Sequence, residues 1–306
     1  RVQLQGLEWL ERQTFAAAHR VISTNESYKR VAVERGGLDP ALVTVVRSGP
    51  DTSVMRPVVP EHDHTGGRHL LVYLGIMGPQ DDVHIALEVM DELVHRRGRT
   101  DVRAALLGFG DCLEELRSTC TSLGLDDVVE FTGRVGPGPI ADYLSSASVG
   151  LGPDRKTPLN DLSTMNKTME YMAFAVPAVS FDLVETQISG GQTGLYVPSG
   201  DVRAFADAVE RLLDDTALRV EMSLAARERA VELMDWRPQA IAYVGVFDGL
   251  FGRTTDPESV VPRPAPAASD PLGRRYVDLD PEVELRAFVT ARGTGPAGSE
   301  ADEPVA

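Results

Sequence analysis

The sequence predicts an α/β protein built on a doubly wound parallel sheet, with part of another domain before the sheet and an irregular tail after it. Three observations predict this class. Across residues 69–252, short apolar runs of strand length alternate with amphipathic runs of helix length, the pattern of strands joined by crossover helices. Glycine turns follow several of the apolar runs. After residue 252 the composition changes to proline and acidic residues.

The overall composition argues against two classes of protein. The chain has 306 residues, 42% of them hydrophobic, which is enough for one large or two medium cores. The formal charge of −16 argues against a nucleic-acid binder, which needs a basic surface to release counterions. The sequence also lacks an apolar run of about 18 residues, so we expect no membrane-spanning helix.

We expect a cytoplasmic protein whose natural N-terminus lies upstream of Arg1. The chain opens without methionine, inside a predicted helix, and shows no secretion signal. Cys112 and Cys120 share one predicted helix and lie about 12 Å apart, too far for a disulfide. Neither has a partner at metal-ligand spacing, so we interpret both as small, partly buried side chains in a reducing compartment.

Residues 1–56 predict the incomplete end of a domain. Helical spacing covers residues 3–19, and short strands are expected at 21–23 and 43–47. Between them, Asn25 is expected to cap a helix that two glycines terminate. This amounts to about one βαβ unit. We expect it to be the remnant of a larger N-terminal domain.

Residues 57–68 predict a linker, because prolines and glycines flank a short polar run. His62 and His64 on either side of Asp63 could form a metal site. No third ligand is spaced to complete a coordination shell, so a flexible polar linker is the better interpretation.

Residues 69–252 predict a complete array of strands and helices. Strands are expected at 69–74, 102–107, 128–131, 149–152, 178–181 and 194–197. Helices are expected at 81–97, with Asp81 as the cap, and at 112–123, 140–146, 165–175, 201–214, 216–233 and 236–251. The stretch 160–185 combines a polar loop, the N-terminus of a helix that Pro177 ends, and the C-terminus of a strand. Open α/β sheets bind ligands at these two kinds of place.

Residues 253–306 predict a largely disordered tail. They hold eight of the twenty prolines and ten acidic residues, a composition that buries little apolar surface. Residues 253–271 and 293–306 have the strongest such bias. Residues 277–290 retain several apolar side chains, so local structure and docking on a partner are the two alternatives for them.

Two glycine turns are candidates for phosphate binding. Gly75 with Gly78, and Gly108 with Gly110, each follow a predicted strand and precede a predicted helix. Glycine allows a ligand to approach the backbone, where free helix N–H groups bind anions. A tight turn without any ligand explains each pair alone equally well.

The helix of the central stretch carries the other candidates. Glu170 lies about one turn into it, and a carboxylate accepts two hydroxyl hydrogen bonds, which suits a ribose diol. Lys167 could neutralise a diphosphate, and Thr164 and Asn166 could contribute backbone N–H groups. The alternative for Glu170 is a solvated residue or an i−3 partner of Lys167.

Asp182 and Glu185 follow the strand of the central stretch. Their carboxylates could accept hydroxyl groups of a sugar or a ribose. The alternative is a pair of capping residues for the next helix.

Several of these segments together resemble the donor-binding half of a family-4 type glycosyltransferase of the GT-B fold. The matching pieces cover roughly residues 15–250 and include VYLGIMGPQDDVHIALEVM, LLGFGDCLEELRSTCTSLGL, VEFTGRV, the central stretch and TGLYVPSGD. The resemblance implies a C-terminal domain that binds a nucleotide-sugar and an N-terminal domain that binds the acceptor. It further implies retaining transfer without a metal or cofactor, with the base near Arg134.

The resemblance leaves the acceptor open, whether glycan, lipid or small molecule. It also leaves room for peripheral membrane contact through an N-terminal domain. The chain departs from the family in three ways. Met77 stands where an arginine is usual, and residues 80–82 (Gln-Asp-Asp) stand near the usual lysine. Leu162 stands where the first of two paired glutamates is usual, with Asp161 beside it. Most of the acceptor domain is absent from the sequence.

The donor phosphates would then depend on Lys167, backbone amides or Arg155. We therefore expect this chain alone to be inactive in transfer. The alternative function is a non-catalytic nucleotide-binding or interaction module derived from such an enzyme. An NAD-dependent dehydrogenase is a weaker alternative, because neither Gly75 nor Gly108 begins the G-x-G-x-x-G pattern.

Overall fold

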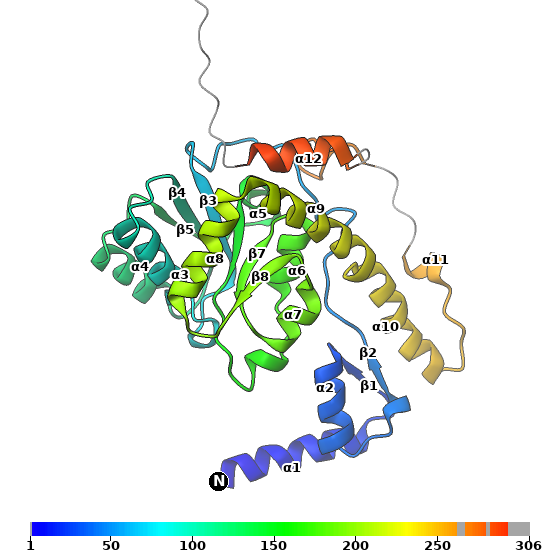
Figure 1. The fold of residues 1–306 in the computed structure, drawn as a ribbon. Helices are drawn as coiled ribbons and strands as arrows, with labels where there is room; N and C mark the ends of the chain where they lie inside the picture. The colour runs from blue at the N-terminus through cyan, green and yellow to red at the C-terminus, as the bar shows by residue number, and fades with distance from the viewer. Residues whose placement is uncertain (1, 262–266, 280–281, 293–306) are drawn as a thin grey trace, which may run out of the picture.

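The chain folds around one six-stranded parallel sheet, flanked by helices on both faces (Figure 1). The structure is a computed structural model that describes residues 2–261, 267–279 and 282–292. The sheet has the order β5-β4-β3-β6-β7-β8, and every adjacent pair is parallel. Its strands are β3 (His69–Ile76), β4 (Val102–Phe109), β5 (Val129–Gly133), β6 (Val149–Gly152), β7 (Ala178–Phe181) and β8 (Gly194–Val197). The predicted doubly wound α/β class is confirmed.

The strand order reverses between β3 and β6. The chain winds outward from β3 through β4 to β5, then returns to β6 on the other side of β3 and winds outward to β8. At such a switch point the connecting segments diverge and leave a crevice at the carboxyl ends of the strands. The crevice is therefore the expected place for a ligand.

A hydrophobic core lies on each face of the sheet. Successive side chains of a strand point to opposite faces, so alternate residues belong to different cores. Leu71 and Tyr73 of β3 face the core formed with α3, α4 and α8, whereas Leu70 and Val72 face the core formed with α5, α6 and α9. The flanking helices are α3 (His84–Asp91, continued by the π-helical turn η4, Glu92–Arg96), α4 (Leu113–Ser122), α5 (Pro137–Ser146), α6 (Asn166–Ala173), α7 (Val184–Gly190), α8 (Val202–Asp214) and α9 (Thr216–Leu233).

The start of the first flanking helix differs from the prediction. Asp81 does not cap it, because this residue lies in a separate 3-10 turn, Pro79–Asp81, and its carboxylate accepts the backbone N–H of Gly78. Asp82 then adopts a left-handed conformation with φ +49°, which interrupts the helical hydrogen bonds, and α3 begins two residues later.

The N-terminal segment forms the expected βαβ unit (Figure 1). It comprises α1 (Val2–Ala17), β1 (Val21–Ser23), α2 (Glu26–Arg30, continued by a π turn at Val31–Arg35), a 3-10 turn (Pro40–Leu42) and β2 (Val43–Val45). Strands β1 and β2 pair in parallel. Asn25 caps α2 as predicted, because its Oδ1 accepts the N–H of Tyr28 at 2.7 Å.

The C-terminal segment is more ordered than predicted. After α10 (Trp236–Leu250) come α11 (Pro257–Val260), a strap over residues 267–279, and α12 (Glu282–Ala291), which packs on α9 (Figure 1). Within residues 253–271, which were expected to be disordered, the structure places the short helix α11 and the start of the strap. Residues 262–266 and 293–306, also expected to be disordered, lie outside the described residues.

Buried anchors explain why the C-terminal segment docks on its own chain. Val277, Leu285 and Val289 share a small core with α9. Arg292 is buried and donates to the carbonyl oxygens of Phe174, Ala175 and Ser145 at 2.7–2.9 Å. The carbonyl oxygens that accept hydrogen bonds from Arg292 lie far away in the sequence, so a local sequence pattern does not predict that this arginine is buried.

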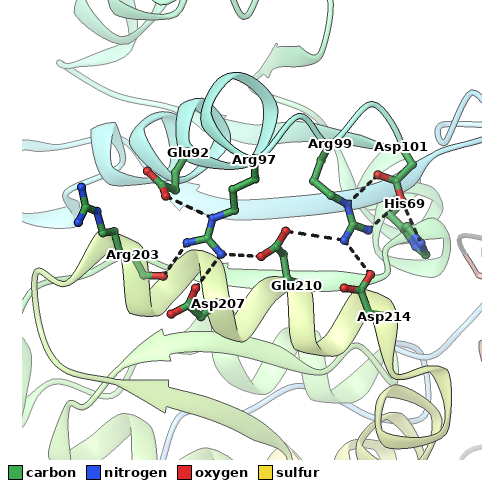
Figure 2. Close-up of polar contacts among 9 residues, drawn as sticks. All are labelled: His69, Glu92, Arg97, Arg99, Asp101, Arg203, Asp207, Glu210 and Asp214. Carbon is green, nitrogen blue, oxygen red and sulfur yellow. Dashed lines mark hydrogen bonds and ion pairs between the residues drawn. The ribbon is translucent and has the colours of Figure 1, made fainter.

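An ion-pair network joins α8 to the end of η4 (Figure 2). Arg97 contacts Glu92 within its own segment, and Asp207 and Glu210 on α8, at 2.5–3.3 Å. Arg99 extends the network to Asp214 at 2.7 Å. Single exposed pairs contribute little to stability. This network lies on the side of the sheet away from α5 and α6, so we assign it a structural role.

Among the described residues, no helix combines the length and the hydropathy needed to cross a bilayer.

Candidate functional site

A cavity of about 890 Å³ lies at the carboxyl ends of β3 and β4 and extends between α5 and α6. It therefore occupies the crevice that the strand order predicts. One end carries polar and charged groups and the other is mostly apolar. The polar end is formed by Asp81, Thr164, Asn166, Lys167 and Glu170. The apolar end includes Val54, Met55, Val58, Val135, Pro137, Ile140, Phe174 and Leu272.

Lys167 is held in place by a buried ion pair with Asp154. The ammonium nitrogen lies 2.7 and 2.9 Å from the two carboxylate oxygens. The side chains are only 8% and 3% exposed. An ammonium has three N–H donors, so one remains for a ligand. Asp154 was not among the residues predicted for the site, although its position two residues after the end of β6 was the available signal.

The N-terminus of α6 presents backbone donors beside Lys167. Met165 occupies the capping position and makes no side-chain cap hydrogen bond, because a thioether is a weak acceptor. The first N–H groups of the helix are thus left for an anion. Thr164, Met165 and Asn166 all line the cavity.

Glu170 also faces the cavity from α6. Burial raises the pKa of its carboxyl above the ordinary value, and the nearby charge of Lys167 opposes that shift. The structure does not support a fully solvated Glu170. Its carboxylate can accept two hydrogen bonds from adjacent hydroxyl groups.

The glycine turns are shaped mainly by the protein's own backbone. Gly75 and Gly108 line the cavity, but Gly78 and Gly110 do not. A Cβ at Gly108 would lie 1.8 Å from the carbonyl oxygen of Gly75, and one at Gly110 would lie 2.5 Å from that of Met77. Close approach of β3 and β4 therefore explains two of the four glycines without any ligand.

We expect Gly108→Ala to lower the free energy of unfolding by about 1–3 kcal/mol, the usual cost of forcing atoms into a packed site. The added methyl group must separate the backbones of β3 and β4, because a carbonyl oxygen occupies its place. Urea denaturation measures the change. Gly78→Ala is the matched control, since its Cβ would meet only the side chains of Gln80 and Asp81. Equal stability of the two variants would contradict the backbone explanation.

Other cationic side chains lie near the cavity with different roles. Arg134 lines it, with its guanidinium 4.5 Å from the centre of the Phe109 ring. Arg155 is not among the lining residues and pairs with Asp82 at 2.6 Å. Met77, where the resemblance leads one to expect arginine, is fully buried. Lys167 is thus the principal cation at the polar end among the described residues.

Asp182 and Glu185 lie outside the cavity, which differs from the expectation of a hydroxyl-binding role. Glu185 is fully buried and binds the N-terminal unit, since it accepts from Ser27 at 2.6 Å and pairs with Arg47 at 3.3 Å. The carboxylate of Asp182 accepts the N–H of Ser199 at 3.1 Å. Ser27, Arg47 and Ser199 lie in other segments of the chain, so a local sequence pattern does not predict these three contacts.

The loop before α6 is also tied to the N-terminal unit. Asn25 donates from its amide to the carbonyl oxygen of Leu162 at 2.8 Å and to the hydroxyl of Thr164 at 3.0 Å. Asp161 caps α7, because its carboxylate accepts the N–H of Val184 at 2.8 Å. These contacts fix the loop that leads to the helix N-terminus. Within the described residues, no cluster of three or more His, Cys, Asp or Glu side chains is suited to a metal ion.

Comparison with known proteins agrees with this architecture. The family described as Glycosyl transferases group 1 matches residues 68–215. A D-inositol 3-phosphate glycosyltransferase of Kineococcus radiotolerans is 28% identical over 266 residues, covering 78% of this chain and 58% of that protein. An alpha-D-kanosaminyltransferase of Streptomyces kanamyceticus is 31% identical over 175 residues, covering 56% and 44%. The chain thus spans about half the length of these relatives.

Solved structures share the fold. Sucrose-phosphate synthase of Thermosynechococcus elongatus superimposes with a TM-score of 0.65 at 20% identity, over 81% of this chain and 62% of that one. Anabaena HepE in complex with UDP gives a TM-score of 0.60 at 16% identity, over 77% and 64%. Residues 68–215 therefore match the glycosyl transferases group 1 family, and the sheet with its flanking helices has the GT-B type fold of these solved structures.

Proposed function

We propose that the cavity binds the nucleotide-sugar donor of a glycosyl transfer reaction. The observation that supports this most is the meeting of Lys167, Glu170 and the N-terminus of α6 at one end of a cavity whose other end is apolar. A nucleoside diphosphate carries anionic phosphates at one end, a ribose diol in the middle and an aromatic base at the other end. The groups along the cavity follow the same sequence. The complex of Anabaena HepE with UDP supports the same class of ligand.

In this proposal each group has one role. Lys167 and the first N–H groups of α6 bind the diphosphate, Glu170 accepts the ribose hydroxyls, and the base lies toward Arg134. Transfer leaves a nucleoside diphosphate carrying the bonding electron pair of the broken sugar–oxygen bond. Lys167 and the helix N-terminus would stabilise that developing charge. Retention of configuration and independence from metals and cofactors are part of the proposal through the family resemblance alone.

The titration of this chain with UDP, GDP, ADP and dTDP tests the proposal. We expect at least one of them to bind with a dissociation constant below one millimolar, because several charge-assisted hydrogen bonds act together. Isothermal titration calorimetry measures the affinity, and uridine without phosphates serves as the control ligand. Absence of binding for all four nucleotides at millimolar concentration would reject the donor site.

A second function, nucleotide binding without catalysis, is favoured by one observation. Met77 and residues 80–82 (Gln-Asp-Asp) stand where the resemblance places two cations. Arg155, which could have replaced them, is paired with Asp82. We expect the chain by itself to bind the nucleotide without transferring a sugar. Incubation with UDP-, GDP-, ADP- and dTDP-sugars, followed by assay of the released nucleoside diphosphate, separates the two functions. Release above the rate without protein would favour catalysis.

A further inference from the structure

The C-terminal strap contributes a wall to the cavity. Asp270, Pro271, Leu272 and Arg274 all line it, although they lie far beyond the matched family segment in the sequence. They face the loop and first turn of α5, which line the apolar end of the same cavity. The cavity is therefore completed by a segment outside the sheet and its flanking helices.

The turn at Asp270–Arg274 is fixed from within. The carboxylate of Asp270 accepts the N–H groups of Leu272 and Arg274 at 2.9 and 2.8 Å. The guanidinium of Arg274 pairs with Asp270, and donates to Asp142 and to the carbonyl oxygen of Gly138, both at 2.6 Å. Both members of the Asp270–Arg274 pair are buried. The turn is thus bound to α5 in one position.

The rest of the strap is anchored as well. The N–H of Val277 donates to the carbonyl oxygen of Pro57 at 2.9 Å. The hydroxyl of Tyr276 donates to the carbonyl oxygen of Val54 at 3.2 Å, and Arg56 stacks over its ring at 4.6 Å. These contacts hold the strap in place, so the turn forms a fixed wall of the cavity.

Leu272 is a large apolar residue of this turn that stays 67% exposed. It approaches α5 so closely that a Cβ at Gly138 would lie 2.3 Å from one of its methyl carbons. Val135 and Ile140 line the cavity nearby. An exposed leucine that faces other apolar cavity residues offers a surface that a flat apolar group can cover.

We propose that Leu272 packs against the nucleobase of the bound nucleotide and helps to set base preference. The inference rests on the donor-site proposal. Since the diphosphate and the ribose occupy the polar end at Lys167 and Glu170, the base must extend toward the apolar end. There, Leu272 lies against Gly138 and extends the apolar wall that Val135 and Ile140 form. The C-terminal strap is then part of the binding site and not an accessory tail.

The test compares ligands with and without a base in three single-residue variants of the 306-residue chain. Leu272→Ala should weaken the preferred nucleoside diphosphate by about three- to tenfold, the effect of losing part of a buried apolar contact. The affinity for inorganic pyrophosphate, measured by displacement of the bound nucleotide, should stay unchanged. Leu272→Trp should narrow the base end and weaken purine diphosphates more than pyrimidine diphosphates. Val283→Ala, at an equally exposed position of α12, is the control and should change neither affinity.

The outcomes separate the two proposals. A loss confined to nucleotides in Leu272→Ala, with an altered purine-to-pyrimidine ratio in Leu272→Trp, supports the base contact. Equal losses for nucleotide and pyrophosphate, or no loss in either, would overturn it while leaving the donor site intact. If the unmodified chain binds none of UDP, GDP, ADP and dTDP, both proposals fail.

Discussion

Lys167→Met is expected to lower the free energy of unfolding by about 3–5 kcal/mol, the usual cost of removing one partner of a buried ion pair. The reason is that the carboxylate of Asp154 would remain almost fully buried without its counter-charge. The same substitution should abolish measurable diphosphate binding, because it removes the principal cation of the polar end. Urea denaturation measures the first effect and calorimetric titration the second.

The double variant Lys167→Met with Asp154→Asn separates these two effects. It should recover much of the lost stability, because no buried charge remains, yet it should not recover nucleotide binding. Lys156→Met is the matched control, since Lys156 is 40% exposed and lies outside the cavity. A single Lys167 variant as stable as the unmodified chain would contradict the buried pair. Binding by the double variant would contradict the phosphate role.

Glu170→Gln is expected to weaken nucleotide binding by about 10- to 100-fold, because a hydrogen bond to a charged acceptor contributes about 1.5–3 kcal/mol. An amide oxygen still accepts hydrogen bonds but carries no charge. Binding of inorganic pyrophosphate should be nearly unchanged if Glu170 contacts the ribose. Glu88→Gln, on the exposed surface of α3, provides the control. Equal losses for nucleotide and pyrophosphate would contradict the ribose role.

The same variant should stabilise the free protein at neutral pH. Burial raises the native pKa of Glu170 above 4.5. Between 4.5 and the native pKa the folded state binds more protons than the unfolded state, so stability falls as pH rises through that window. Above the window the ionised carboxylate destabilises the fold, and glutamine removes this cost. The gain in melting temperature should therefore shrink as the pH is lowered toward 4.5.

Nucleotide affinity should follow the opposite course with pH. The ribose contact requires the ionised carboxylate, so affinity should fall as pH drops through the raised native pKa of Glu170. The Glu170→Gln variant should lack this component of the pH dependence. Titrations at several pH values with both proteins measure it, and identical profiles would show that Glu170 does not bind the ligand in its ionised form.

Several features of the site could be predicted from the sequence. The carboxyl ends of the strands follow from the apolar runs, and Pro177 marks where the helix of the central stretch must end. Lys167, Glu170 and Thr164 then fall at the N-terminal end of that helix. All three line the cavity. To predict this, it is enough to know that parallel strands present their carboxyl ends at one edge of the sheet.

Other features depended on segments far apart in the chain. Glu185 was expected to bind sugar or ribose hydroxyls, or to cap a helix, and it binds Ser27 and Arg47 of the N-terminal unit. The strap was expected to be disordered in part, yet Arg274 binds it to α5. In both cases a charged side chain finds its partner more than 100 residues away in the sequence.

By itself, the sequence determined the α/β class, the positions of the strands and the helix that carries Lys167 and Glu170. Periodicity and helix-stop signals act between residues a few positions apart, so they can be read locally. Only the tertiary structure decided that Asp154 pairs with Lys167, that backbone contact requires Gly108, and that Leu272 closes the cavity. These features depend on which surfaces meet once the chain is folded, and burial then fixes the energy of each contact.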